Sequence, residues 1–240
     1  MSMELVTIEA TGGASTSGAH NEAVKKLADY LVDNTEYLEL LCECSNGSIL
    51  TFAGSDLKVG IYNNNNHIYI GIGYVESTED SENNVVIQFL KNVICTQQHN
   101  EIYMNYKSVG GNIVATIKFN AIKNGKTIYI TYNNSTINGF GIVYDKSGEV
   151  YLFNNNNFVT EAGDIMTASN IINSSLAYAD RILMLPLSPL SNSLIENIQI
   201  ENMYYYSDDK SLAANTKIEI DGKIYYVMQG KMMICITEEG

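Results

Sequence analysis

The fold class of this chain is indicated by one segment, Leu38-Glu39-Leu40-Leu41-Cys42-Glu43-Cys44-Ser45-Asn46-Gly47-Ser48-Ile49-Leu50-Thr51-Phe52. From Tyr37 onward the apolar residues follow a period of two, which is typical of strands with one buried face. Asn46-Gly47 separates segments 38–45 and 48–52, and this dipeptide favours a two-residue turn because both residues tolerate a positive φ. The stretch therefore predicts a β-hairpin.

Three similar patterns occur further along the chain. The predicted turns are Asn124-Gly125 between 112–122 and 126–132, Lys146-Ser147-Gly148 between 140–144 and 149–153, and Asp221-Gly222 between 216–220 and 223–228. Four hairpins with alternating flanks predict a mainly β fold, an antiparallel sandwich or barrel-like domain.

An amphipathic helix is predicted over 21–32, after a short strand over 4–10. Val24, Leu27, Ala28 and Leu31 recur at spacings of three and four residues. Ser17 and Asn21 are the candidate N-caps, and Asp33-Asn34 favours the end of the helix. A weaker helical pattern over 162–178 predicts a second helix. Its Asn and Ser residues lower the helix propensity, so a non-helical segment is the alternative.

No Pro/Gly/Ser-rich linker divides the chain, so we expect a single domain overall. It consists of a strand-loop-helix arm over 1–36 and a β-rich domain over 37–240. The β-rich domain contains three polar segments. One is an acidic stretch over 76–84, expected to be an exposed loop, and the others are two runs of four asparagines, 63–66 and 154–157. The asparagines favour surface turns, with a ligand-facing ladder as the alternative. A buried strand is expected over 181–185, ending at Pro186.

Composition excludes several function classes. Twenty-seven acidic residues against 14 basic ones give a net charge of −13, and Arg181 is the only arginine. The chain therefore lacks the cluster of basic residues that is typical of a dedicated nucleic-acid binder. The apolar stretch 182–187 is far shorter than the roughly 20 residues of a membrane helix, so we expect no membrane partner. The four cysteines have no framework spacing, which favours reduced thiols in a protein made in the cytoplasm.

The motifs for catalysis and metal binding are incomplete. Residues 13–18 have the glycine spacing of a phosphate-binding loop, but Ala19-His20 stand where Lys and Ser/Thr are required. Cys42 and Cys44 are only half of a zinc set, so we expect both to face the core. No Gly-x-Ser-x-Gly motif accompanies the three histidines, which are His20, His67 and His99. The adjacent acid pairs 79–80, 208–209 and 238–239 predict solvated turns. We therefore expect no enzyme activity, no catalytic or metal-binding residues and no cofactor.

Two groups of residues are candidate protein–protein contacts. One is the helix face of Val24, Leu27 and Leu31, which would pack on a neighbour or on the chain's own sheet. The other is the run Tyr204-Tyr205-Tyr206, because tyrosine combines a large contact area with a polar tip. The alternative for this run is a strand with one or two tyrosines packed inward.

The layout resembles a known class of proteins. A small-residue loop and helix are followed by hairpins, the segment Arg181-Ile182-Leu183-Met184-Leu185-Pro186-Leu187-Ser188-Pro189, a hairpin over 218–227 and the apolar segment 231–236. This is similar to small β-rich virion proteins of tailed phages, or of phage-tail-like particles, from low-GC Gram-positive bacteria. The resemblance implies a non-enzymatic neck, tail, baseplate or capsid-associated protein. Its partners would be other virion proteins and copies of itself, in a homo-oligomeric ring or array. A carbohydrate- or receptor-binding β module is the alternative, and an enzyme with a site assembled from distant residues comes third.

Overall fold

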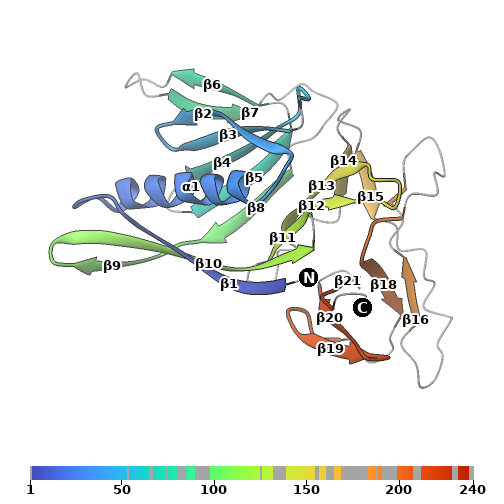
Figure 1. Cartoon of the computed structure of the whole chain (residues 1–240). Helices are drawn as coiled ribbons and strands as arrows, with labels where there is room; N and C mark the ends of the chain where they lie inside the picture. The colour runs from blue at the N-terminus through green and yellow to red at the C-terminus, as the bar shows by residue number, and fades with distance from the viewer. Residues whose placement is uncertain are drawn as a thin grey trace. The chain divides into compact units, whose positions relative to one another are not determined.

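The computed structural model describes most of the chain (Figure 1). The described residues are 2–52, 54–64, 67–73, 75–79, 85–89, 98–124, 126–131, 139–154, 157–160, 165–168, 183–186, 189–190, 199–207, 212–228 and 232–237. Within them the chain is mostly β, with antiparallel sheets and one helix. The prediction of a mainly β, antiparallel fold with a firm N-terminal helix is confirmed.

The chain folds into two compact units. Leu5–Phe119 belongs to one of them, here the N-terminal unit. The C-terminal unit contains Met1–Glu4, Asn120–Thr160 and Ile165–Gly240. This division differs from the predicted boundary at residue 36. The physical reason is that the N-terminal strand and helix pack within the N-terminal unit and do not form a separate arm.

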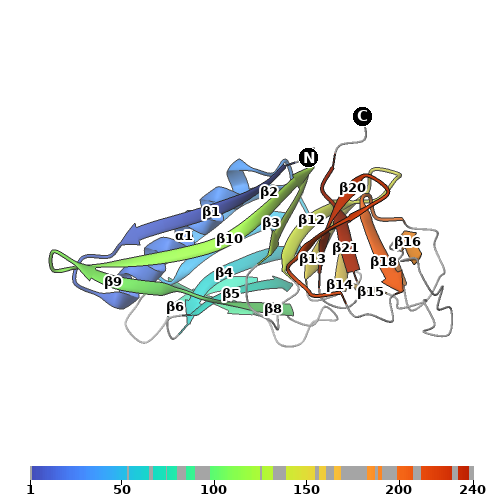
Figure 2. The same ribbon diagram turned by 90° about the horizontal axis from the view of Figure 1, so that it is seen from below.

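In the N-terminal unit, the helix lies between two layers of strands (Figures 1 and 2). Helix α1 (Thr16–Asp33) contacts the sheet of order β2-β3-β4-β5-β8 on one side, where Asn63 Nδ2 donates to Asn21 Oδ1 at 2.8 Å. On the other side, the ring of Tyr30 lies edge-on to Phe119 of β10, with centroids 5.4 Å apart. There β10 pairs with both β1 and β9. The strands of this unit are β1 (Ser2–Thr11), β2 (Leu38–Cys44), β3 (Gly47–Phe52), β4 (Lys58–Asn64), β5 (His67–Gly73), β6 (Val75–Glu79), β7 (Val85–Phe89), β8 (Gln98–Tyr103), β9 (Asn105–Val109) and β10 (Asn112–Asn124). The first residues of β1 and the last residues of β10 belong to the other unit.

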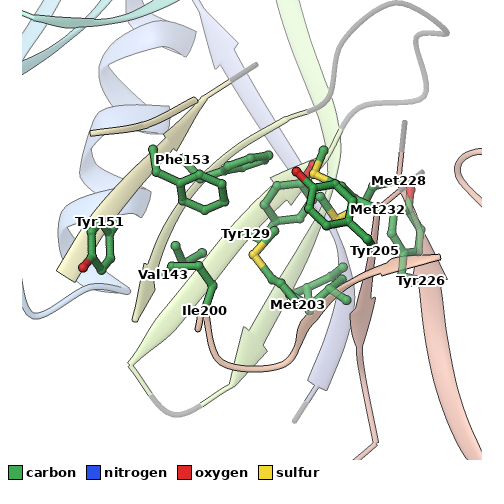
Figure 3. Close-up of a cluster of buried hydrophobic side chains, with 13 residues drawn as sticks. Tyr129, Val143, Tyr151, Phe153, Ile200, Met203, Tyr205, Tyr226, Met228 and Met232 are labelled. Atoms are coloured by element: carbon green, nitrogen blue, oxygen red, sulfur yellow. The ribbon is translucent and has the colours of Figure 1, made fainter. Parts of the chain in front are cut away.

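The C-terminal unit is built from two antiparallel sets of strands. From the end of β10, the first set continues in the order β11, β12, β13, β14, β15 and β17, and the second has the order β16-β18-β21-β20-β19. Their bounds are β11 (Thr127–Thr131), β12 (Phe140–Tyr144), β13 (Val150–Asn154), β14 (Asn157–Thr160), β15 (Ile165–Ala168), β16 (Leu183–Pro186), β17 (Pro189–Leu190), β18 (Met203–Ser207), β19 (Lys217–Ile220), β20 (Lys223–Val227) and β21 (Met232–Cys235). Aromatic and methionine side chains from both sets form one buried cluster, including Tyr129, Phe153, Met203 and Tyr226 (Figure 3).

The predicted hairpins are present, but the first two turns are each displaced by one residue. In the second hairpin Asn124, predicted as a turn residue, is the last residue of β10 and pairs with Thr127. Asp221 and Gly222 both have a positive φ, 50° and 78°, as a two-residue hairpin turn with two left-handed residues requires. In the first hairpin, however, Cys44 pairs with Gly47, so the turn is Ser45-Asn46 and Gly47 begins β3. A Cβ on Gly47 would lie 2.0 Å from the carbonyl oxygen of Ile61, so this glycine permits the close approach of β4.

The asparagine runs also lie at strand ends. Asn64 pairs with His67 between β4 and β5, and Asn154 pairs with Asn157 between β13 and β14. The described asparagines of both runs thus flank hairpin connections, as the turn interpretation predicted. Asn63 is not a surface ligand, because it is buried and bonded to Asn21 of the helix.

Two predictions of local structure are wrong where the structure describes them. Ile165–Ala168, within the predicted second helix, is strand β15 and pairs with β14; the rest of 162–178 lies outside the described residues. Val75–Glu79, which overlaps the predicted loop 76–84, is strand β6 and pairs with β7, whereas 80–84 also lies outside them. In both cases pairing with a neighbouring strand overrides the local sequence preference.

The helix begins earlier than predicted and ends as predicted. Ser15 is the N-cap, with an extended backbone and a side-chain oxygen that accepts from the Gly18 N–H at 3.2 Å. Ser17 and Asn21 lie inside the helix, so neither is the cap. Asn34 is the C-cap, in agreement with the Asp33-Asn34 stop.

Replacing the cap provides a direct test of this helix start. Ser15→Ala should lower the free energy of unfolding by about 1 kcal/mol, because the first turn loses its side-chain acceptor. Ser17→Ala, two residues later at an exposed position, should change it by less than about 0.5 kcal/mol. Urea unfolding followed by circular dichroism measures both, and a larger loss for Ser17→Ala would contradict the assigned cap.

Candidate functional site

The six residues predicted as contact surfaces lie within the chain's own packing. Val24, Leu27 and Leu31 of α1 are fully buried in the N-terminal unit. In β18, Tyr205 and Tyr206 are only 4% exposed, and Tyr204 lies half-buried with its ring edge-on to Tyr225. Burial raises the pKa of Tyr205, so its hydroxyl stays protonated. The inward-packed alternative describes these tyrosines, and the helix face packs on its own sheets.

The histidines and cysteines are placed on several elements. His20 is buried in α1 with its ring edge-on to Tyr106, and His67 begins β5. His99 is in β8. Cys44 is buried and Cys42 is half-buried, so only Cys44 is fully in the core as predicted. Their sulfur atoms lie 3.9 Å apart.

The Cys42–Cys44 pair has the electrostatics of core thiols. Burial, and next the neighbouring Cys42, raises the pKa of the Cys44 thiol to about 12. A protonated thiol is neither a good nucleophile nor a metal ligand at neutral pH. In the described part of the chain, no three His, Cys, Asp or Glu side chains gather as a metal site would require.

A buried carboxylate that the sequence did not single out lies at the β12–β13 turn. Asp145 Oδ1 accepts from the backbone N–H groups of Ser147 at 2.8 Å and Glu149 at 3.0 Å, and from the Ser147 hydroxyl at 2.6 Å. The Tyr151 hydroxyl donates to Glu149 Oε2 at 3.0 Å and to Asp145 Oδ2 at 3.3 Å. Burial, followed by its hydrogen bond to Glu149, raises the pKa of Tyr151. All of these partners belong to one hairpin, so the carboxylate stabilises the turn. The signal in the sequence is an Asp at the first position of a turn that contains Ser and Gly.

The role of this carboxylate can be tested by two substitutions. Asp145→Ala should lower the free energy of unfolding by about 3 kcal/mol, because two N–H groups and two hydroxyls lose a charged acceptor. Asp145→Asn keeps an acceptor at Oδ1 and should cost about 1 kcal/mol. Thermal unfolding compares them, and equal losses for the two variants would contradict this account.

The hairpin of β9 and β10 contains a fully exposed strand. All five residues of β9 are exposed, including Tyr106 at 59% and Val109 at 50%. Gly110 and Gly111, with φ of 59° and 85°, form its two-residue turn. Among the described strands, β9 pairs only with β10, so its second edge is open. Figure 2 shows this hairpin reaching past the end of α1. The signal for this hairpin in the sequence is the Gly-Gly dipeptide between strand-like flanks, which is not among the four predicted turns.

A second open edge in the same unit belongs to β2. This strand pairs only with β3 among the strands that are described. It exposes two adjacent leucines, Leu40 at 44% and Leu41 at 52%, beside a bulge between Leu40 and Cys42. Adjacent exposed leucines on a strand edge are a feature of contact surfaces.

Comparison with family models, curated proteins and solved structures gave no match to this chain. In the described residues, no helix is both long and apolar enough to span a membrane.

Proposed function

We propose that this chain is a non-enzymatic structural protein of a tailed-phage virion or phage-tail-like particle. It assembles with copies of itself and with other virion proteins, in a neck, tail, baseplate or capsid-associated ring. The observation that carries the proposal is the open edge of β9, a strand exposed on both faces that carries Tyr106 and Val109. The resemblance stated from the sequence supplies the kind of particle.

Open strand edges are surfaces for repeated protein–protein contacts. Their unpaired N–H and C=O groups can pair with a strand from another chain, and monomeric proteins therefore usually block them with proline, charge, bulges or a covering loop. Strand β9 contains no proline and only one charged residue, Lys107. A chain with an unblocked edge suits a protein whose working state is an assembly.

The alternative of a carbohydrate- or receptor-binding module depended on tyrosine and asparagine side chains at a surface. Tyr205 and Tyr206 are buried, and Asn63 is bonded to Asn21. No specific observation in the described residues favours that function over assembly.

Deletion of the gene from the producing strain tests the proposal. Electron microscopy of induced lysates should then show incomplete particles, and a plasmid copy of the full chain should restore complete ones. A plasmid copy that carries Leu27→Asp is the matched control for a chain that is expressed but not folded. Complete particles in the deletion strain would overturn the proposal.

A further inference from the structure

We infer that β9 of one copy pairs with the β2 edge of a second copy, so that the chain associates head to tail. The inference rests on the proposed function, because it names the contact through which the chain would assemble. The occupant of the β9 edge is therefore a second copy of this chain. Charge and exposed apolar surface indicate which strand of the second copy pairs with β9.

The open edge of β9 has defined hydrogen-bonding positions. The two-residue turn closes on the pair Val109–Asn112, and antiparallel pairs alternate between hydrogen-bonded and non-hydrogen-bonded positions. Val109, Lys107 and Asn105 therefore bond to β10, whereas the backbone groups of Tyr106 and Ser108 point toward the open edge. These groups are available to a strand from another molecule.

Charge favours β2 as the partner strand. Lys107 is the only charged residue of β9, and β2 carries Glu39 and Glu43. Glu43 already lies 3.5 Å from Lys25 of the helix, which leaves the exposed Glu39 as the carboxylate facing an incoming lysine. Leu40 and Leu41 beside it match the exposed Tyr106 and Val109 of the incoming strand.

The edge of β1 is a less suitable partner. It also carries acidic residues and an exposed leucine, Leu5. However, Lys26 Nζ donates to the backbone carbonyl of Glu9 at 3.0 Å, so a side chain already occupies a main-chain acceptor of β1. Glu4 in turn lies 2.8 Å from Lys123.

The two edges are separate, so one copy can use both. Strand β2 lies in the layer on one side of α1, and β9 lies in the layer on the other side (Figure 1). Contacts between two different surfaces are heterologous, and they build a closed ring or an open filament according to the rotation between copies.

Sedimentation velocity of the purified full chain tests the pairing of β9. The wild type should associate with increasing concentration, and Ser108→Pro should abolish this, because proline removes an N–H group from the open edge and leaves the bonds to β10 intact. Ser108→Ala should associate as the wild type does. Equal association of Ser108→Pro and wild type would overturn the inference.

A charge exchange tests the choice of β2. Lys107→Glu and Glu39→Lys should each weaken self-association about tenfold, because like charges would face each other across the strands. An equimolar mixture of the two variants should form mixed complexes, since β9 of the first variant then faces a lysine on β2 of the second. The control is Lys118→Glu, which makes the same charge change at an exposed position of β10 outside the pairing with β9. A mixture that remains dissociated, or an unaffected Glu39→Lys variant, would overturn the assignment of β2.

These results are distinguishable from failure of the proposed function. Particles that contain the chain, together with wild-type association of Ser108→Pro, would overturn this inference and leave the function in place. Absence of the chain from particles would overturn the function, whatever the sedimentation of the purified protein shows.

Discussion

Leu27→Asp is expected to unfold the N-terminal unit. Leu27 is completely buried in α1. This helix lies between the layer of β2–β5 and the layer of β10 (Figure 1). The substitution removes a buried leucine, at a cost of about 2–5 kcal/mol, and places a carboxylate in an apolar interior at a cost of several kcal/mol more. This is comparable to the whole stability of a typical domain, about 5–15 kcal/mol.

The control is the same substitution at an exposed leucine of the same unit. Leu41→Asp changes a side chain that is 52% exposed, so the free energy of unfolding should change by less than about 0.5 kcal/mol. Circular dichroism and urea unfolding measure folding, and sedimentation shows whether Leu41→Asp loses association while remaining folded. A folded Leu27→Asp variant with the wild-type unfolding midpoint would contradict the assignment of this residue to the core.

The second large loss of stability is expected for a substitution of Gly12, one of two adjacent glycines between β1 and α1. A Cβ on Gly12 would lie 1.8 Å from the backbone nitrogen of Ala19, in the first turns of the helix. Because the obstacle is backbone, the loop or the helix must move, and we expect Gly12→Ala to cost at least ~3 kcal/mol. This glycine permits close packing of the loop on the helix.

Gly13 provides the matched comparison. It has a φ of +64°, and a Cβ there would have no atom within 4 Å. Gly13→Ala should therefore cost only the backbone strain of a left-handed alanine, about 1–2 kcal/mol. Guanidinium unfolding of the two variants gives the difference, and a greater loss for Gly13→Ala would show that the described packing of Gly12 is incorrect.

The elements that could be predicted from the sequence are those with a strong local pattern. The stripe of Val24, Leu27, Ala28 and Leu31 identified the helix, since a period near 3.6 predicts one buried face. Asp221-Gly222 identified the terminal hairpin, because both residues adopt the positive φ that the turn requires. In each case the signal and the structure involve residues close together in the chain.

The sequence was less informative where the cause lies in another element. The Asn46-Gly47 pattern predicts Gly47 as a turn residue, although the close approach of the β4 backbone, and not the turn, is what requires a glycine there. Segment 165–168 has a helical apolar pattern, but pairing of Phe158 with Met166 makes it a strand. Such pairings join residues that no local pattern connects.

The candidate contact residues also could not be identified from local sequence alone. Residue type identified Tyr204, Tyr205 and Tyr206, but tyrosine is common both in cores and at interfaces, and only the packing decides between them. Tyr106 and Val109 stand in an ordinary short strand, and their exposure depends on β9 being the last strand beside β10. An open edge is a property of the topology and is not encoded in any single segment.

Quantitative mass spectrometry of density-purified phage or tail-like particles from the producing strain measures whether the chain is a component of the particle. The chain should be present at a fixed, small-integer copy number relative to the portal or tube protein. Absence of the chain from the particles, despite clear expression in the cell, would contradict a structural role in the virion.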